Sequence, residues 1–226
     1  MPALTRDGDV FTLDLGDGEN RFNPSWVGEV LDAVAEVDAA EGPRALLLVA
    51  RGKIWSNGLD LDWMMANRDE VPRFIGDVQE LLARMLELSA PSIALIQGHC
   101  FAAGALLALT CDIRLMRADR GYFCLPEVDI DIPFSPGMSA MIQAKLSPQA
   151  AHEAMTTGRR YGGEEAAGMA IVDGATSEEA LVGAGASAAE RLAPKAGPTL
   201  KTIRSQMYRG SIDLLRQGAA IQIPGI

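Results

Sequence analysis

Two stretches of this sequence place small residues where a ligand could approach the backbone closely, and a third adds a carboxylate. Asn57 and Gly58 form a turn before the amide of Leu59, and segment 102–105 (AAGA) opens an apolar run. The first amides of a helix are unpaired donors that stabilise a developing anion. Glu127, which follows a proline, can take up and release a proton. The sequence therefore predicts backbone amides facing a carboxylate, although close helix packing alone would also explain the small residues.

Strand-like runs precede these residues and would hold them in place. Residues 9–15 alternate apolar and polar side chains as a half-buried strand does, and residues 45–49 and 92–96 form apolar runs. A helix is predicted to start at residues 23–25, between the first two strands. The succession of strand, helix and strand indicates a right-handed crossover unit. These patterns predict an α/β fold.

The remaining patterns are helical. Residues 72–89 carry their apolar side chains on one helical face, and residues 102–109 are apolar all round, as in a buried helix. The segment that follows residue 132 indicates short helices interrupted by prolines. Residues 161–173 are predicted as a loop, a helix and a short exit, and the last helices are predicted over 177–192 and 198–215. No linker divides the chain, so residues 1–226 are predicted as one domain.

Composition excludes several classes of protein. The chain has 226 residues, 48% of them hydrophobic, so a substantial core is available. No run of about 18 apolar residues is present, and the N-terminus lacks the apolar stretch of a secretory signal, which favours a cytoplasmic protein. The net charge is −10 with scattered basic residues, which argues against nucleic acid as a partner.

Metal and disulfide chemistry are not indicated. The three cysteines have no CxxC spacing, and an odd number fits no closed disulfide framework, so reduced, buried thiols are predicted. With only two histidines, a zinc site of ordinary composition is difficult to assemble. We therefore predict no metal site.

Three segments carry a family resemblance when they are taken together. The chain contains, in this order, KIWSNGLDL (53–61), PSIALIQGHCFAAGALLALTCDIRL (91–115) and YFCLPEVDIDI (122–132). Together they resemble the crotonase superfamily, the enoyl-CoA hydratase and isomerase fold, from about Val10 to about Ile203. The resemblance implies a ββα spiral core over 1–175 and C-terminal helices over 176–226.

The resemblance also implies a substrate and an assembly. The substrate would be a coenzyme A thioester of fatty acid metabolism, with no tightly bound cofactor. The protein would form a homotrimer or a dimer of trimers, in which C-terminal helices cover neighbouring sites. The tail IQIPGI (221–226) is expected to shorten the C-terminal helical region that covers the neighbouring site.

The family's catalytic residues can be assigned to this sequence one position at a time, and they correspond to three residues. The backbone amides of Leu59 and Ala103 would form the oxyanion hole, and Glu127 would be the acid and base. Leu106 occupies the position of a second glutamate that the hydratases use, and an aliphatic side chain can neither orient nor protonate water. The resemblance therefore favours an isomerase that converts 3-enoyl-CoA to 2-enoyl-CoA with a single carboxylate.

Two alternatives stay open. Asp129 or Asp131 could replace the missing glutamate in a hydratase or another crotonase reaction, or the chain could be a non-catalytic protein that binds acyl-CoA. Asp112, in a Cys-Asp pair similar to that of the family, is expected to bond nearby backbone amides.

Substrate contacts are expected around both amide junctions. Two side chains have competing explanations, since Lys53 could be ordinary solvated charge at a strand end and Trp55 could pack in the core. The full set of expected substrate-binding residues is Lys53, Trp55, Ser56, Asn57, Gly58, Leu61, Gly104, Leu106 and Phe134.

Overall fold

The structure is a computed structural model, and it describes residues 1–218 of the chain. The expectation about the tail 221–226 concerns residues outside this range. None of the helices within it is both long and apolar enough to cross a membrane.

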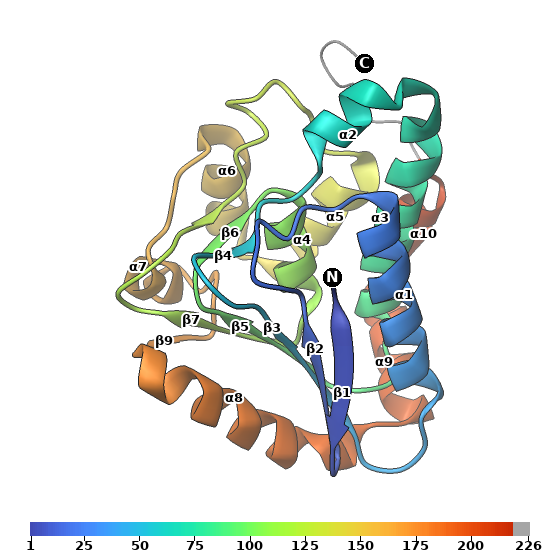
Figure 1. The fold of residues 1–226 in the computed structure, drawn as a ribbon, viewed down its shortest axis with the longest axis vertical. Helices are drawn as coiled ribbons and strands as arrows, with labels where there is room; N and C mark the ends of the chain where they lie inside the picture. The colour runs from blue at the N-terminus through green and yellow to red at the C-terminus, as the bar shows by residue number, and fades with distance from the viewer. Residues whose placement is uncertain (219–226) are drawn as a thin grey trace.

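The larger of two sheets has six strands within the described residues, in the order β1-β2-β3-β5-β7-β9. All neighbouring strands run parallel except the hairpin of β1 and β2. The strands are β1 (Ala3–Asp7), β2 (Val10–Asp14), β3 (Ala45–Val49), β5 (Ser92–Ile96), β7 (Ile113–Arg117) and β9 (Gly174–Thr176). The predicted α/β fold is confirmed, but strand β1 was not predicted (Figure 1).

A smaller parallel sheet contains β4 (Ile54–Ser56), β6 (His99–Phe101) and β8 (Phe123–Cys124). Each of these strands follows one strand of the large sheet, in the pairs β3 and β4, β5 and β6, and β7 and β8. Each pair then leads into a helix. The chain therefore repeats a ββα unit three times, and the ends of β4, β6 and β8 lie at one edge because the sheet is parallel.

Helices connect and cover the sheets. Asn23 caps α1 by accepting from the N–H of Trp26, as its position before a proline predicts. The helices are α1 (Pro24–Ala39), α2 (Leu61–Ala66), α3 (Val71–Leu86), α4 (Ala103–Thr110), α5 (Pro136–Lys145), α6 (Pro148–Thr157), α7 (Gly163–Gly168), α8 (Glu178–Leu192), α9 (Pro198–Met207) and α10 (Arg209–Arg216), with short 3-10 turns at Arg68–Glu70 and Ala193–Lys195.

The predicted helix over 198–215 is two helices, because the backbone leaves helical geometry at Tyr208 (φ −106°, ψ 14°). Pro136 and Pro148 do not interrupt helices. They begin α5 and α6, where the missing N–H of proline costs no hydrogen bond.

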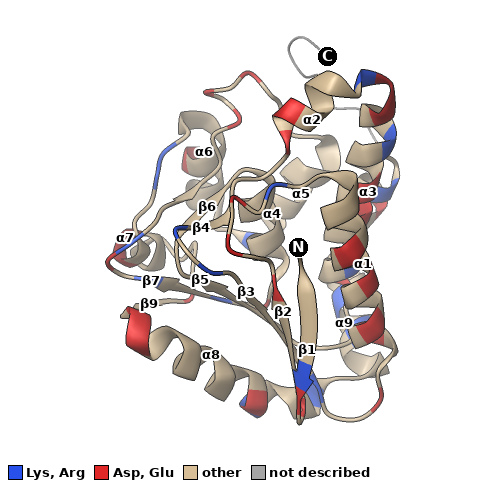
Figure 2. Cartoon of the chain, in the orientation of Figure 1, with Lys and Arg blue, Asp and Glu red and all other residues tan. Residues whose placement is uncertain are grey.

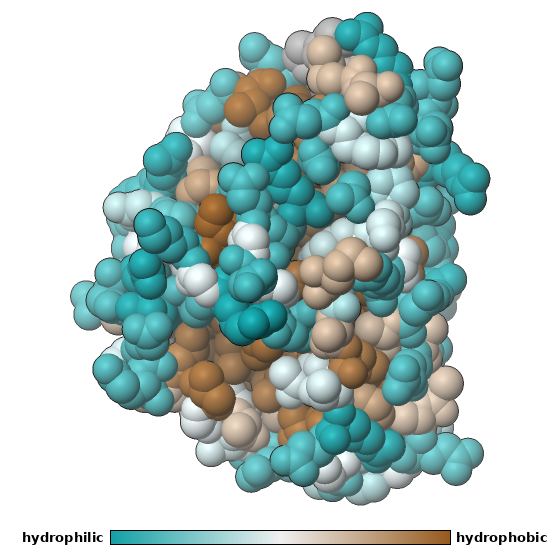
Figure 3. All heavy atoms as spheres, viewed as in Figure 1, coloured by the Kyte–Doolittle hydropathy of each residue, from teal (hydrophilic) through white to brown (hydrophobic). Residues whose placement is uncertain are grey.

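Two cores lie on opposite faces of the large sheet. On one face α8 packs against β3 and β5 through Leu181, Ala188 and Ala189. The other face carries the main core, in which every residue of α4 is buried. Figure 1 shows α8 apart from the other helices, and Figure 3 shows hydrophobic residues gathered in the recess between it and the sheet. The predicted division between 1–175 and 176–226 stays a prediction, and strand β9 extends across it.

Candidate active site

The three ββα units place three residues at equivalent positions. Leu59 follows β4, Ala103 follows β6 and Glu127 follows β8, each two or three residues after its strand. All three line one cavity, whose empty space of about 480 Å³ is partly open to solvent. The complete lining is Asn57, Leu59, Leu61, Ala102, Ala103, Leu106, Glu127, Ile130, Ile132, Pro133, Phe134 and Met138.

The junction after β4 is held by a buried hydroxyl and a glycine. Ser56 donates to the carbonyl oxygen of Asn20 (2.8 Å) and accepts from the N–H of Gly58 (3.1 Å). Gly58 has a φ of +80°, and a Cβ there would lie 2.8 Å from the Cβ of Ala102 and 2.9 Å from the nitrogen of Ala103. Only glycine therefore lets the two junctions come into contact.

The junction after β6 is strained and tightly packed. Ala102 has a φ of +49° and a ψ of −126°, a conformation that costs a non-glycine residue about 1–3 kcal/mol. A Cβ at Gly104 would lie 2.6 Å from the Cβ of Ser56, so this glycine brings α4 against β4. Neither the N–H of Leu59 nor that of Ala103 has a hydrogen-bond acceptor among residues 1–218. Two free donors thus line the cavity side by side.

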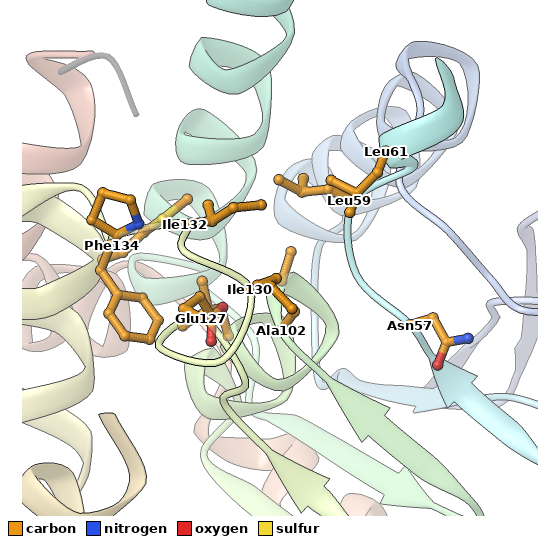
Figure 4. Close-up of a pocket in the computed structure, with 12 residues that line it drawn as sticks. Asn57, Leu59, Leu61, Ala102, Glu127, Ile130, Ile132 and Phe134 are labelled. Carbon is orange, nitrogen blue, oxygen red and sulfur yellow. The ribbon is translucent and has the colours of Figure 1, made fainter. Parts of the chain in front are cut away.

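Glu127 begins a turn that covers the cavity. The N–H of Ile132 donates to the carbonyl oxygen of Glu127 (3.1 Å), and the N–H of Asp129 donates to that of Pro126 (2.9 Å). Figure 4 shows Glu127 beneath this turn, with Ile130, Ile132 and Phe134 around it and Leu59 and Leu61 across the cavity.

The carboxylate of Glu127 is buried without a countercharge. The residue is 8% exposed, and its buried Oε2 has no hydrogen-bond partner in the described part of the chain. Burial raises the pKa of Glu127 to about 8, because an apolar surrounding disfavours the charged form. The walls nearby are Leu106, Ile132, Pro133, Phe134 and Met138. A carboxyl group that titrates near neutral pH is suited to moving protons.

Four of the nine expected substrate-binding residues line the cavity, namely Asn57, Leu61, Leu106 and Phe134. Ser56, Gly58 and Gly104 lie behind it and hold the junctions. The other two are not at the cavity. Trp55 is fully buried in the core, and Lys53 is exposed before β4, at the opposite end of that strand.

The aspartates proposed as substitutes for the missing glutamate lie outside. Asp129 and Asp131 are exposed, and neither lines the cavity that contains Leu59 and Ala103. Asp131 does line a second, more open pocket that also borders Glu127.

Ile130 and Ile132, which alternate with these aspartates, line the first cavity, and so do Pro133 and Met138. Of the two isoleucines, Ile132 is buried and Ile130 is 41% exposed. These four apolar residues were not predicted, and the alternation in VDIDI would not have found them, because Val128 and Ile130 are exposed as the aspartates are.

The remaining predictions concern structure. Asp112 accepts hydrogen bonds from the N–H (2.8 Å) and hydroxyl (3.3 Å) of Ser92, which confirms its expected bond to a backbone amide. Cys100, Cys111 and Cys124 are free and buried. Residues 1–218 contain no group of three side chains suited to hold a metal ion.

Three ββα units that wind around one cavity define a crotonase fold. A crystal structure of an enoyl-CoA hydratase/isomerase family protein from Pseudomonas syringae superposes with a TM-score of 0.88, covering 96% of this chain and 94% of that one at 24% identity. The apo structure of an enoyl-CoA isomerase from Mycobacterium tuberculosis gives 0.86, covering 96% and 95% at 20% identity. At these identities the likeness shows the fold.

Sequence similarity shows the family. Residues 9–223 match the enoyl-CoA hydratase/isomerase family, to which this chain belongs. Enoyl-CoA delta isomerase 2, peroxisomal, of Arabidopsis thaliana is 37% identical over 223 residues, covering 92% of each chain. Enoyl-CoA delta isomerase 3 of the same plant is 36% identical over 219 residues, with the same coverage.

Proposed function

We propose that this protein is an enoyl-CoA isomerase that moves the double bond of a 3-enoyl-CoA to the 2-position. The observation that carries the proposal is a lone buried carboxylate, Glu127, opposite Leu106 in an apolar cavity. Similarity to proteins named enoyl-CoA delta isomerases supports the same reaction.

The thioester oxygen would accept hydrogen bonds from the amides of Leu59 and Ala103. Removing a proton from C2 moves negative charge onto this oxygen, and two fixed donors stabilise the charge as it develops. The two amides need no reorganisation because the contact between Gly58 and Ala103 already sets their spacing. Losing one such donor typically costs roughly 2.7–4 kcal/mol of barrier.

Glu127 would carry the proton. Its ionised carboxylate removes a proton from C2, and the electrons of that C–H bond form a dienolate. The carboxyl group then returns the proton to C4, the double bond settles between C2 and C3, and the charge leaves the oxygen. One proton is taken and one returned, so a single carboxylate is sufficient. The apolar walls exclude water from the dienolate.

Hydration is disfavoured by the same geometry. Adding water across a double bond needs a group to activate the water and another to protonate the carbon. Leu106 can do neither, and Asp129 and Asp131 are exposed and do not line the cavity that contains the two amides.

The test compares two reactions of the purified protein. We expect conversion of a 3-enoyl-CoA to the conjugated 2-enoyl-CoA, and hydration of 2-enoyl-CoA at least a hundredfold slower. Glu127→Gln should lower the isomerase kcat about 10²–10⁴-fold, since it removes the proton carrier and keeps the shape. Asp129→Asn is the matched control, with activity expected within twofold of the wild type. Unchanged activity of Glu127→Gln would refute the proposal.

The remaining expectations concern assembly, location and the coenzyme A part of the substrate. A homotrimer or dimer of trimers, a cytoplasmic location, and uptake of coenzyme A as part of the substrate stay predictions. Mass measurement in solution and localisation of the tagged protein would test the first two. One relative is named a peroxisomal enzyme, which makes the localisation experiment informative.

A further inference from the structure

The loop between β2 and α1 lies alongside the junction after β4. We call residues 16–22 of this connection the anchor loop. Its contact with the junction begins where the N–H of Asn57 donates to the carbonyl oxygen of Glu19 (3.0 Å). Figure 1 shows the connection between β2 and α1 beside the segment that leads from β4 to α2.

The anchor loop sets the direction of the Leu59 amide. Phe22 and Leu59 form a parallel bridge, in which the N–H of Phe22 donates to the carbonyl oxygen of Gly58 (2.7 Å). The N–H of Asp60 donates to the carbonyl oxygen of Phe22 (2.8 Å). The carbonyl of Gly58 and the N–H of Leu59 belong to one trans peptide group, in which they point in opposite directions. Because the carbonyl points toward the loop, the N–H of Leu59 points away from it.

Asn20 attaches the anchor loop to β4 through a buried side chain. This residue is 9% exposed, and its Nδ2 donates to the carbonyl oxygens of Trp55 (3.0 Å) and Ile54 (3.2 Å). A longer bond of 3.4 Å reaches the carbonyl oxygen of Gly16. The main-chain carbonyl of Asn20 accepts from the hydroxyl of Ser56, which in turn accepts from the next junction amide. One residue therefore connects the loop, the strand and the junction.

The anchor loop is itself held by the core. Phe22 is fully buried and stacks on Trp26 of α1, with 4.2 Å between the ring centroids. The indole N–H of Trp26 donates to the carbonyl oxygen of Leu15 (3.3 Å). A Cβ at Gly16 would lie 2.7 Å from Oδ1 of Asn20, so the amide has little room to turn. The loop can therefore serve as a fixed support for the junction.

The outer side of the anchor loop carries exposed ion pairs. Arg21 lies 2.5 Å from a carboxylate oxygen of Glu19 and 2.7 Å from one of Asp62 on α2. Figure 2 shows charged positions on this connection and on α2. Ion pairs in contact with solvent contribute little to stability. The buried amide of Asn20 is therefore the stronger attachment.

We propose that Asn20 is a positioning residue of the reaction, which keeps the amide of Leu59 pointing at the thioester oxygen through the anchor loop and Ser56. This inference rests on the proposed function for the identity of the reaction. Asn20 does not line the cavity of Leu59 and Ala103, so it acts through the junction. A displaced donor loses most where the charge on the oxygen is largest, which is in the transition state.

Arg44 provides a matched control for a purely structural role. It is 5% exposed and donates to the carbonyl oxygens of Val37 and Gly42 (both 2.9 Å). It precedes β3, whereas the junction follows β4 beyond the other end of β3. Loss of this side chain should therefore lower stability and leave the oxyanion hole unchanged.

The first test compares rate constants of the purified variants. Asn20→Gly retains a backbone that favours positive φ and removes the amide, whereas Asn20→Asp retains the shape and cannot donate when ionised. We expect each variant to lower kcat for a 3-enoyl-CoA about tenfold or more and to change KM less than threefold. Arg44→Leu should unfold at a lower urea concentration than the wild type and keep kcat within twofold.

The second test is spectroscopic and needs no turnover. Acetoacetyl-CoA loses a C2 proton readily, and its enolate absorbs in the near ultraviolet. Two donors on the thioester oxygen favour this enolate. With protein in excess, we expect Asn20→Gly to reduce the enolate absorbance about threefold or more relative to the wild type, and Arg44→Leu to leave it unchanged.

Wild-type kcat values in both Asn20 variants would overturn the inference. So would a loss that appears in KM alone, or one that Arg44→Leu reproduces. If the wild type isomerises no 3-enoyl-CoA while Asn20→Gly still weakens the enolate absorbance, the proposed function fails and the positioning role stands. Circular dichroism checks that each variant is folded, and Asn20→Asp decides the question if Asn20→Gly does not fold.

Discussion

At the scale of single residues, the chemistry depends on the environment of Glu127. A carboxyl group in water ionises near pH 4, whereas this one is buried among aliphatic and aromatic side chains. No basic side chain pairs with it among the described residues, so its burial is uncompensated. The pKa of Glu127 therefore rises to about 8, where proton uptake and release are both accessible.

The raised pKa predicts the pH dependence of the isomerase. The reaction begins with the ionised carboxylate, and below its pKa Glu127 is mostly protonated. We expect kcat/KM to rise with pH and to level off above about pH 8. A pH–rate profile measured between pH 5 and 10 checks this, since roughly a tenfold loss per pH unit is expected below the pKa. A profile that is flat between pH 6 and 9 would contradict the assignment.

The same shift affects stability, with a definite sign. Since the pKa of Glu127 is raised by folding, from 4.5 to about 8, the folded state holds a proton that the unfolded chain releases. Burial of Glu127 therefore does not destabilise the folded protein below about pH 4.5, where both states are protonated, and destabilises it fully above about pH 8. Glu127→Gln should therefore unfold at higher denaturant concentration than the wild type at pH 8 and show no such gain at pH 4.

At the scale of elements, the site is made by the contact of two strand-to-helix junctions. Gly58 and Gly104 each occupy a place where a methyl group would overlap the other junction. Neither glycine touches the ligand cavity, yet together they set the separation of the two free amides.

Gly58→Ala should impair catalysis more than folding. The added Cβ would collide with Ala102 and with the nitrogen of Ala103, so one of the two amides must move away from the position of the thioester oxygen. We expect kcat to fall about 10²–10³-fold, as for loss of one donor. Gly42→Ala is the matched control, because Gly42 has a φ of +78° with open space around it. Gly42→Ala introduces the same backbone strain without a collision, so equal kcat values for the two variants would contradict the geometric argument.

Short elements explain where the sequence patterns failed. Strands β4, β6 and β8 have only two or three residues, too few for a period-two pattern to be detected. Prolines that indicated interruptions instead begin α5 and α6, since a helix start and a helix break use the same residue. Longer periodic segments were predicted better: both ends of α3 and α8 fall within a few residues of the predicted bounds, and the start of α1 was predicted correctly.

At the scale of the whole molecule, one buried arginine ties the C-terminal helices to the core. Arg204 on α9 is 3% exposed and lies 3.4 Å from a carboxylate oxygen of Asp112. It donates hydrogen bonds of 2.9–3.1 Å to four carbonyl oxygens at the end of α3 and in the following loop, those of Met85, Leu86, Leu88 and Ala90.

Arg204→Leu should destabilise the protein strongly. The four carbonyl oxygens and Asp112 would lose their partner while most of the site stays buried, which costs about 3–5 kcal/mol when one side of a buried pair is removed. Urea unfolding monitored by tryptophan fluorescence measures the change. Arg209→Leu, exposed at the start of α10, should alter the unfolding free energy by less than about 0.5 kcal/mol. A loss for Arg204→Leu no larger than for this control would show that α9 is held otherwise.

The sequence alone determined the α/β class, the long helices, and three segments in which two amide junctions precede one carboxylate, because these depend on local residue type and period. Only the tertiary structure decided that Leu59, Ala103 and Glu127 meet in one cavity, that Trp55 is core, and that Asp129 and Asp131 are exposed. Whether a side chain faces a cavity or the solvent depends on how three ββα units wind against one another. Local periodicity contains no information about that winding.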